Sequence, residues 1–192
     1  MENKILNDYD KVSWGISIET VKNIYPELDY IHKMENGIKL LSNSKLIEEQ
    51  DYHLGKIFKF FNNELYGVEV IYFIELNSEF YGFLINSFQK KYGQVSFVKA
   101  VESKPNETLL RQILEENNDP ETIKEMELYL NDSYDSTKIM VKNISSEMKI
   151  LIYDTITIIK SKNEKMNHHV RFKYLNPKIL DRIQENNFNK KK

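Results

Sequence analysis

The chain has 192 residues, no cysteine and a formal net charge of −2. Its length suits one domain that buries about 70% of its unfolded surface, so folding requires neither disulfides nor a structural metal. The lack of cysteine excludes thiolate nucleophiles, cysteine-ligated zinc and iron–sulfur clusters, and the near-neutral charge argues against bulk binding of nucleic acid.

The N-terminal sequence "MENKILNDYD" contains no apolar run, so it is not a signal peptide. The rest of the chain contains no apolar stretch of the roughly 18 residues that a membrane-spanning helix requires. We therefore expect a soluble, cytoplasmic protein, or an exported one if a leader has been removed.

The first predicted helix covers residues 17–25, within "VSWGISIETVKNIYPEL". Ser17 is a suitable N-cap, and Pro26 cannot continue the helix. We expect Trp14 to be buried beneath this helix, and Gly15 to permit the sharp entry of the chain.

Strands follow the first helix. The sequence "NNE" between two apolar runs predicts a tight hairpin, because asparagine tolerates the left-handed backbone conformation. The run over residues 70–74 is apolar on both faces, which is typical of a central strand. The predicted strands of this half cover residues 37–42, 45–49, 53–61 and 65–74.

A second helix is predicted over residues 78–92. Ser78 is its expected cap, its apolar residues recur at helical spacing, and Gly93 suits the position after its end. A further strand is predicted over 94–101.

Residues 105–134 have two short helical patterns rich in acidic residues, and "NDSYDS" (131–136) indicates a turn that ends the second one. The apolar stripe of this pair is too thin to enclose a core, so it indicates an insertion into the sheet domain. Three more strands are predicted over 137–144, 149–161 and 168–175. Asn176 and Pro177 then begin a short final helix.

These elements predict an α+β fold: an antiparallel sheet with two short helices packed on one face and an appended acidic helical pair. We divide the chain into an N-terminal segment (1–11), one α+β domain (12–175, with 105–134 as the insertion), and a short C-terminal helix with a basic tail (176–192). Charge is uneven, with a net of −7 over 112–135 and +7 over 160–192.

The start Trp14, Gly15, Ser17, Glu19 and Val21, together with "KKYG" (90–93), resembles a type of small bacterial domain. Residues 12–98, and more weakly 137–175, look like the half-domains of the β-lactamase inhibitor protein. More distantly they resemble the small lipoprotein of the outer-membrane assembly machine. The resemblance implies helices on one face of an antiparallel sheet and a binding role without catalysis.

Motifs for chemistry are scarce. The sequence contains no phosphate-binding glycine loop, no nucleophile elbow and no zinc-binding helix motif. His168 and His169 are adjacent in a predicted strand, so they point to opposite faces and cannot share a metal ion. An enzyme without a recognisable motif would use a pocket around His168, Glu164 and Asp154.

We predict a non-catalytic binding module, without cofactor or metal, whose partner is another protein. His169, Arg171 and Lys173 are the candidate partner-binding residues, because they alternate with core residues and form a basic rim on one exposed face. Thirteen of the 23 aromatic residues lie between Tyr52 and Phe97. The alternative is therefore an apolar small molecule or lipid in an aromatic-lined groove. We expect neither specific nucleic-acid binding nor a membrane span.

Overall fold

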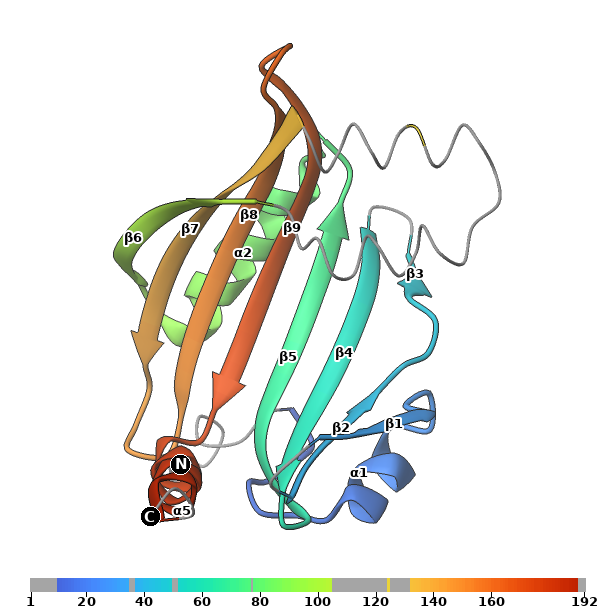
Figure 1. Ribbon diagram of the computed structural model, residues 1–192, viewed down its shortest axis with the longest axis vertical. Helices are drawn as coiled ribbons and strands as arrows, with labels where there is room; N and C mark the ends of the chain where they lie inside the picture. Colours follow the sequence, from blue (N-terminus) through green and yellow to red (C-terminus); the bar gives the residue numbers. More distant parts are fainter. Residues whose placement is uncertain are drawn as a thin grey trace.

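One antiparallel sheet forms the body of the molecule (Figure 1). The computed structural model describes residues 10–34, 37–49, 52–76, 78–104, 124 and 132–189. The strands of these residues lie in the order β1-β2-β4-β5-β9-β8-β7-β6, and β3 also pairs with β4. Their bounds are β1 (Tyr30–Lys33), β2 (Ile38–Ser42), β3 (Ile47–Glu48), β4 (Tyr52–Phe61), β5 (Glu64–Ile74), β6 (Ser96–Ser103), β7 (Ser133–Asn143), β8 (Lys149–Ile159) and β9 (Glu164–Leu175). The predicted α+β class and antiparallel sheet are confirmed.

The hairpin between β4 and β5 turns at two asparagines. Asn62 and Asn63 have φ angles of 49° and 68°, the left-handed conformation that a two-residue hairpin turn requires. The prediction from "NNE" is therefore confirmed, although Glu64 already belongs to β5. The hairpin places β5 in the middle of the sheet, between β4 and β9.

Helix α1 (Ile18–Ile24) is one residue shorter at each end than the predicted 17–25, because Ser17 and Tyr25 are its caps. The Ser17 hydroxyl accepts a hydrogen bond from the Thr20 amide at 3.2 Å, and the helix stops before Pro26. Gly15 has a φ of 84°, which explains the sharp entry. Trp14 is only partly buried, although it packs against the core, so the expectation of full burial is wrong.

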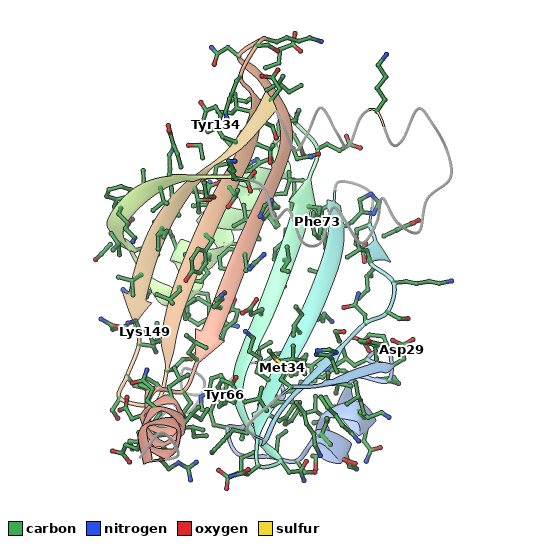
Figure 2. The ribbon with its side chains drawn as sticks, viewed as in Figure 1. Asp29, Met34, Tyr66, Phe73, Tyr134 and Lys149 are labelled. Carbon is green, nitrogen blue, oxygen red and sulfur yellow. The ribbon has the colours of Figure 1, made fainter. Side chains whose placement is uncertain are left out.

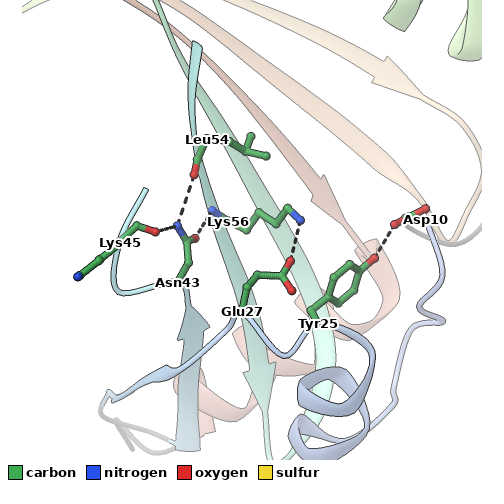
Figure 3. A network of polar contacts seen from close by, with 7 residues as sticks. All are labelled: Asp10, Tyr25, Glu27, Asn43, Lys45, Leu54 and Lys56. Carbon is green, nitrogen blue, oxygen red and sulfur yellow. Dashed lines mark hydrogen bonds and ion pairs between the residues drawn. The ribbon is translucent and has the colours of Figure 1, made fainter. Parts of the chain in front are cut away.

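Polar contacts tie the segments around α1 to the sheet (Figure 3). The Tyr25 hydroxyl donates to Asp10 at 2.6 Å, and Lys56 of β4 forms a 3.0 Å ion pair with Glu27. Asn43 accepts a hydrogen bond from the Lys56 amide at 2.7 Å. These contacts hold the segment before α1 against the end of that helix, and the segments after α1 and after β2 against β4.

Helix α2 (Phe80–Tyr92) packs on the same face of the sheet as α1, and Figure 1 shows it behind β8 and β9. The Phe88 ring lies 5.1 Å from that of Phe172, and the Tyr25 ring lies 5.1 Å from that of Phe58. Both helices therefore bury their apolar residues in one core. Helix α2 begins two residues later than predicted, since Ser78 accepts from the Phe80 amide but lies outside the helix.

Helix α5 (Pro177–Asn189) packs at one end of the sheet, where Figure 1 shows it at the bottom. Asn176 accepts a hydrogen bond from the Ile179 amide at 3.2 Å, so it caps the helix as a start at Pro177 requires. Ile179 and Ile183 form a small second core with Phe61 and Tyr66.

Three sequence-based boundaries need correction. Ser133 and Tyr134 belong to β7, so the predicted helical insertion does not extend to residue 134, and the turn predicted at 131–136 is largely strand. Most of the predicted acidic pair lies outside the described residues, as does most of segment 1–11. Strand β9 begins at Glu164 rather than 168, because the chain reverses tightly at Asn163, which has a φ of 54°.

Candidate functional site

The face of the sheet opposite α1 and α2 carries a mixture of apolar and charged side chains, and we call it the open face. Its residues alternate along each strand with the core residues, and the strand register places them in adjacent rows. Among the described residues no helix lies over the middle of this face. Its members there are Ile57, Lys59, Glu69, Ile71, Phe73, Ile139, Val141, Leu151, Tyr153, His169, Arg171 and Lys173.

The three predicted partner-binding residues lie together on this face. His169, Arg171 and Lys173 alternate along β9 with Val170, Phe172 and Tyr174, which are 0%, 2% and 8% exposed. The alternation that the sequence indicated is therefore present in the structure. The role of the three residues in binding stays a prediction.

A buried carboxylate that the sequence analysis did not single out occupies the centre of the open face. Glu69 of β5 is only 3% exposed. Its Oε1 lies 2.5 Å from Lys59 Nζ and 3.2 Å from Lys173 Nζ, and its Oε2 lies 3.9 Å from Arg171 Nη1. Burial alone would raise the pKa of Glu69, but these cations hold it below its ordinary value, so the carboxylate is ionised.

His169 does not contribute positive charge to the basic rim that the sequence predicts. Its ring lies 6.0 Å from the ring of Phe73, which is the cross-strand neighbour of His169 on β5 and is labelled in Figure 2. Burial, and then the charge of Arg171, lower the pKa of His169 below its ordinary value near 6.5. His169 is therefore neutral at pH 7, and Arg171 and Lys173 carry the positive charge of β9 on this face.

The opposite face holds a cavity of about 270 Å³ between α2 and the sheet. Its walls are mostly aromatic, and burial raises the pKa of one of them, Tyr72, to about 12, so this hydroxyl stays protonated. Asp10, Ser87 and Lys91 supply the polar part of the lining. The aromatic walls are Tyr72, Phe88, Tyr92, Phe172 and Tyr174.

A second polar cluster lies on the helix-covered face. Asp154 of β8, only 5% exposed, accepts a hydrogen bond from the Tyr81 hydroxyl at 2.8 Å, and its other oxygen lies 2.8 Å from His168 Nε2. Burial raises the pKa of Asp154, but the hydrogen bonds from His168 and Tyr81 outweigh that effect and lower it. The contact joins α2 to two neighbouring strands.

This cluster does not assemble the catalytic set that an enzyme hypothesis requires. Glu164 is exposed and begins β9, four residues from His168, or roughly 13 Å along a strand. The cavity described above is lined by other residues. His168 and His169 point to opposite faces as predicted, with the rings of Tyr81 and Phe73 as their respective neighbours.

Within the described part of the chain, no group of three or more histidines, aspartates or glutamates is arranged to hold a metal ion. No helix among those residues has the length and apolar character needed to cross a membrane. Comparison with protein-family models, with curated proteins and with solved structures finds no match to this chain.

Proposed function

We propose that the chain is a non-catalytic binding module whose open face contacts another protein. One observation carries the proposal: partly exposed apolar side chains lie on β4, β5, β7 and β8, in two groups on either side of the polar and charged residues of β9, and no described helix covers them. Contiguous apolar patches on a protein surface mark interaction sites more often than isolated apolar residues do. The side chains are Ile57, Ile71, Phe73, Ile139, Val141, Leu151 and Tyr153.

The charges on this face favour an acidic partner. Lys59, Arg171 and Lys173 surround the single carboxylate of Glu69, so the centre of the face has an excess of positive charge. An interface that combines apolar contacts with arginine is typical of protein recognition, and complementary charge speeds the encounter. The partner surface is therefore expected to pair apolar residues with aspartate or glutamate.

The resemblance of residues 12–98 to half-domains of the β-lactamase inhibitor protein fits this proposal. Such domains combine helices on one face of a sheet with binding that requires no catalytic group. Both α1 and α2 pack on one face here, and no described helix covers the middle of the other.

Site-specific photocrosslinking tests the proposal. A benzophenone amino acid is placed at Phe73, which is 40% exposed on the open face, and in a second variant at Phe83, which is 67% exposed on α2. In cells of the native host we expect a discrete protein adduct from position 73 and none from position 83. Equal adducts from both positions, or none from position 73, contradict the proposal.

Charge reversal at the same face is the second part of this test. Arg171→Glu combined with Lys173→Glu is expected to abolish the adduct from position 73, because both cations lie at the centre of the face. Lys90→Glu combined with Lys91→Glu changes the same charge on α2 and is expected to leave the adduct intact. A partner that tolerates the first pair shows that it binds elsewhere.

The cavity between α2 and the sheet favours a second candidate function, the binding of an apolar small molecule or lipid. Its volume of about 270 Å³ and its five aromatic walls are the specific observation. Pockets of small-molecule ligands are typically apolar, with a few polar groups that fix orientation. Under this alternative neither crosslinker position captures a protein, and an organic compound co-purifies with the chain.

A further inference from the structure

We propose that Arg171 is the anchor of the open face, and that it binds an aspartate or glutamate carboxylate of the protein partner. This inference rests on the proposed function and names the chemistry by which the open face recognises its partner. The structure supports it through the unsatisfied hydrogen-bond donors of Arg171, the surplus of positive charge around Glu69 and the apolar neighbours of the guanidinium.

The guanidinium of Arg171 has donors without acceptors. Its Nε is buried and makes no hydrogen bond to any described residue, and its Nη1 lies 3.9 Å from Glu69 Oε2, beyond hydrogen-bond distance. A buried donor without an acceptor is unfavourable, and pairing it with an acceptor removes that cost. The side chain is nevertheless 37% exposed, so an incoming group can reach its outer nitrogens.

Glu69 does not require Arg171 to neutralise it. Lys59 and Lys173 already lie 2.5 Å and 3.2 Å from Glu69 Oε1. The cluster therefore contains three cations and one anion. The surplus positive charge is greatest at Arg171, the cation farthest from the carboxylate, and an added carboxylate there would balance the cluster further.

The neighbours of Arg171 favour the binding of a planar carboxylate whose own neighbours are apolar. Its cross-strand partners are Ile71 on β5 and Tyr153 on β8, which flank it on both sides of β9. Apolar flanks lower the local dielectric constant and strengthen a charge-assisted hydrogen bond. The planar fork of arginine matches the two oxygens of a carboxylate, and arginine is enriched among the residues that dominate binding energy in interfaces.

Proton–nitrogen NMR of the arginine Nε–H groups in the full chain tests the inference directly. The sequence has three arginines, so their resonances are assignable by Arg→Lys substitution. The probe is a capped peptide of alternating glutamate and leucine, and the control peptide has glutamine in place of every glutamate. We expect the Arg171 resonance to move toward saturation with the glutamate peptide and to stay in place with the glutamine peptide.

Arg182 is the internal control, because it already forms a 2.6 Å ion pair with Glu64 at an exposed site. Its resonance is expected to remain in place at peptide concentrations that move Arg171. Arg171→Lys keeps the charge and removes the bidentate fork, so it is expected to weaken peptide binding roughly tenfold. Arg182→Lys should leave the affinity unchanged.

The inference is overturned by equal movement with the glutamine peptide, by equal movement of Arg182, or by no saturable movement of Arg171. If inorganic phosphate moves the Arg171 resonance at lower concentrations than the glutamate peptide does, the site binds phosphate and the inference is overturned. The crosslinking experiment distinguishes failure of the proposed binding face from failure of Arg171 as its anchor. An adduct from position 73 that persists in Arg171→Lys with unchanged yield leaves the binding face in place and removes Arg171 as its anchor.

Discussion

Asp154 carries a buried charge that is held by two partners from different elements. Tyr81 of α2 donates to one carboxylate oxygen and His168 of β9 lies at 2.8 Å from the other. Hydrogen bonds to a charged group each contribute about 1.5–3 kcal/mol. We predict that Asp154→Asn lowers the free energy of unfolding by about 2–4 kcal/mol, measured by urea denaturation.

A double-mutant cycle shows whether this loss arises from the pairing itself. Tyr81→Phe alone removes one hydrogen bond and is expected to cost about 1–2 kcal/mol. In the Asp154→Asn background the same change should cost less, because its acceptor is already neutral. Full additivity of the two changes contradicts the contact.

At the scale of residues, the sequence predicts which face of a strand a side chain occupies, but not its partners from distant elements. The period of two in a strand correctly separates His168 from His169 and places His169, Arg171 and Lys173 on one face. It gives no means of pairing Tyr81 with Asp154, which are 73 residues apart. Glu69 was missed for the same reason, since its cations come from β4 and β9.

At the scale of elements, alanine substitutions at two glycines are expected to change stability in opposite directions. Gly82 lies inside α2, where an added Cβ meets no atom within 4 Å. Gly82→Ala is therefore expected to stabilise the protein by about 0.5–1 kcal/mol, because glycine is a poor helix former. Gly37 has a φ of +79°, and a Cβ there would lie 2.7 Å from the Asn62 side chain.

Gly37→Ala is accordingly expected to destabilise the protein by more than 1 kcal/mol, through backbone strain and the contact with Asn62. The midpoint of thermal unfolding measures both variants, and each serves as the control for the other. A fall in the midpoint for Gly82→Ala would show that α2 is not packed as the structure describes.

Elements with strong local signals were predictable. Ser17, Pro26 and Gly93 bound their helices, and "NN" forms the hairpin turn, because cap and turn chemistry acts within a few residues. Strand β1 was missed because all four of its residues are exposed and show no apolar alternation, and the strand is defined by its pairing with β2. The start of β7 was missed because polar residues at 133–136 resemble a turn.

For the whole molecule, the sequence leaves the strand order open. Strand β9 pairs with β5 although about 100 residues separate their pairing positions, and this crossing joins the two halves of the sheet. Hairpin signals specify neighbours along the chain, whereas such a long-range pairing is decided by the burial of Val170 and Phe172 beneath the helices. The open face is a consequence of that pairing.

The pH dependence of stability reflects buried titratable groups on both faces of the sheet. The pKa of Glu69 and that of Asp154 lie below their ordinary values of 4.5 and 3.8, and that of His169 lies below 6.5. Between each folded pKa and the higher unfolded one, the unfolded chain binds more protons than the folded chain. Stability is therefore expected to fall as the pH drops below about 6.5, and more steeply as it drops through about 4.5.

Glu69→Gln tests this dependence at the centre of the open face. The variant is expected to be less stable at pH 7 by roughly 1–3 kcal/mol, because Lys59 and Lys173 lose their buried partner. It should also lose less stability than the unchanged protein between pH 6 and pH 3.5, since the titrating carboxylate is gone. Urea denaturation across this range measures both effects.

Glu147→Gln is the matched control, because its pair with Lys178 is exposed to solvent and contributes little. An equal loss of stability on acidification in Glu69→Gln and in the unchanged protein would show that Glu69 does not couple folding to pH.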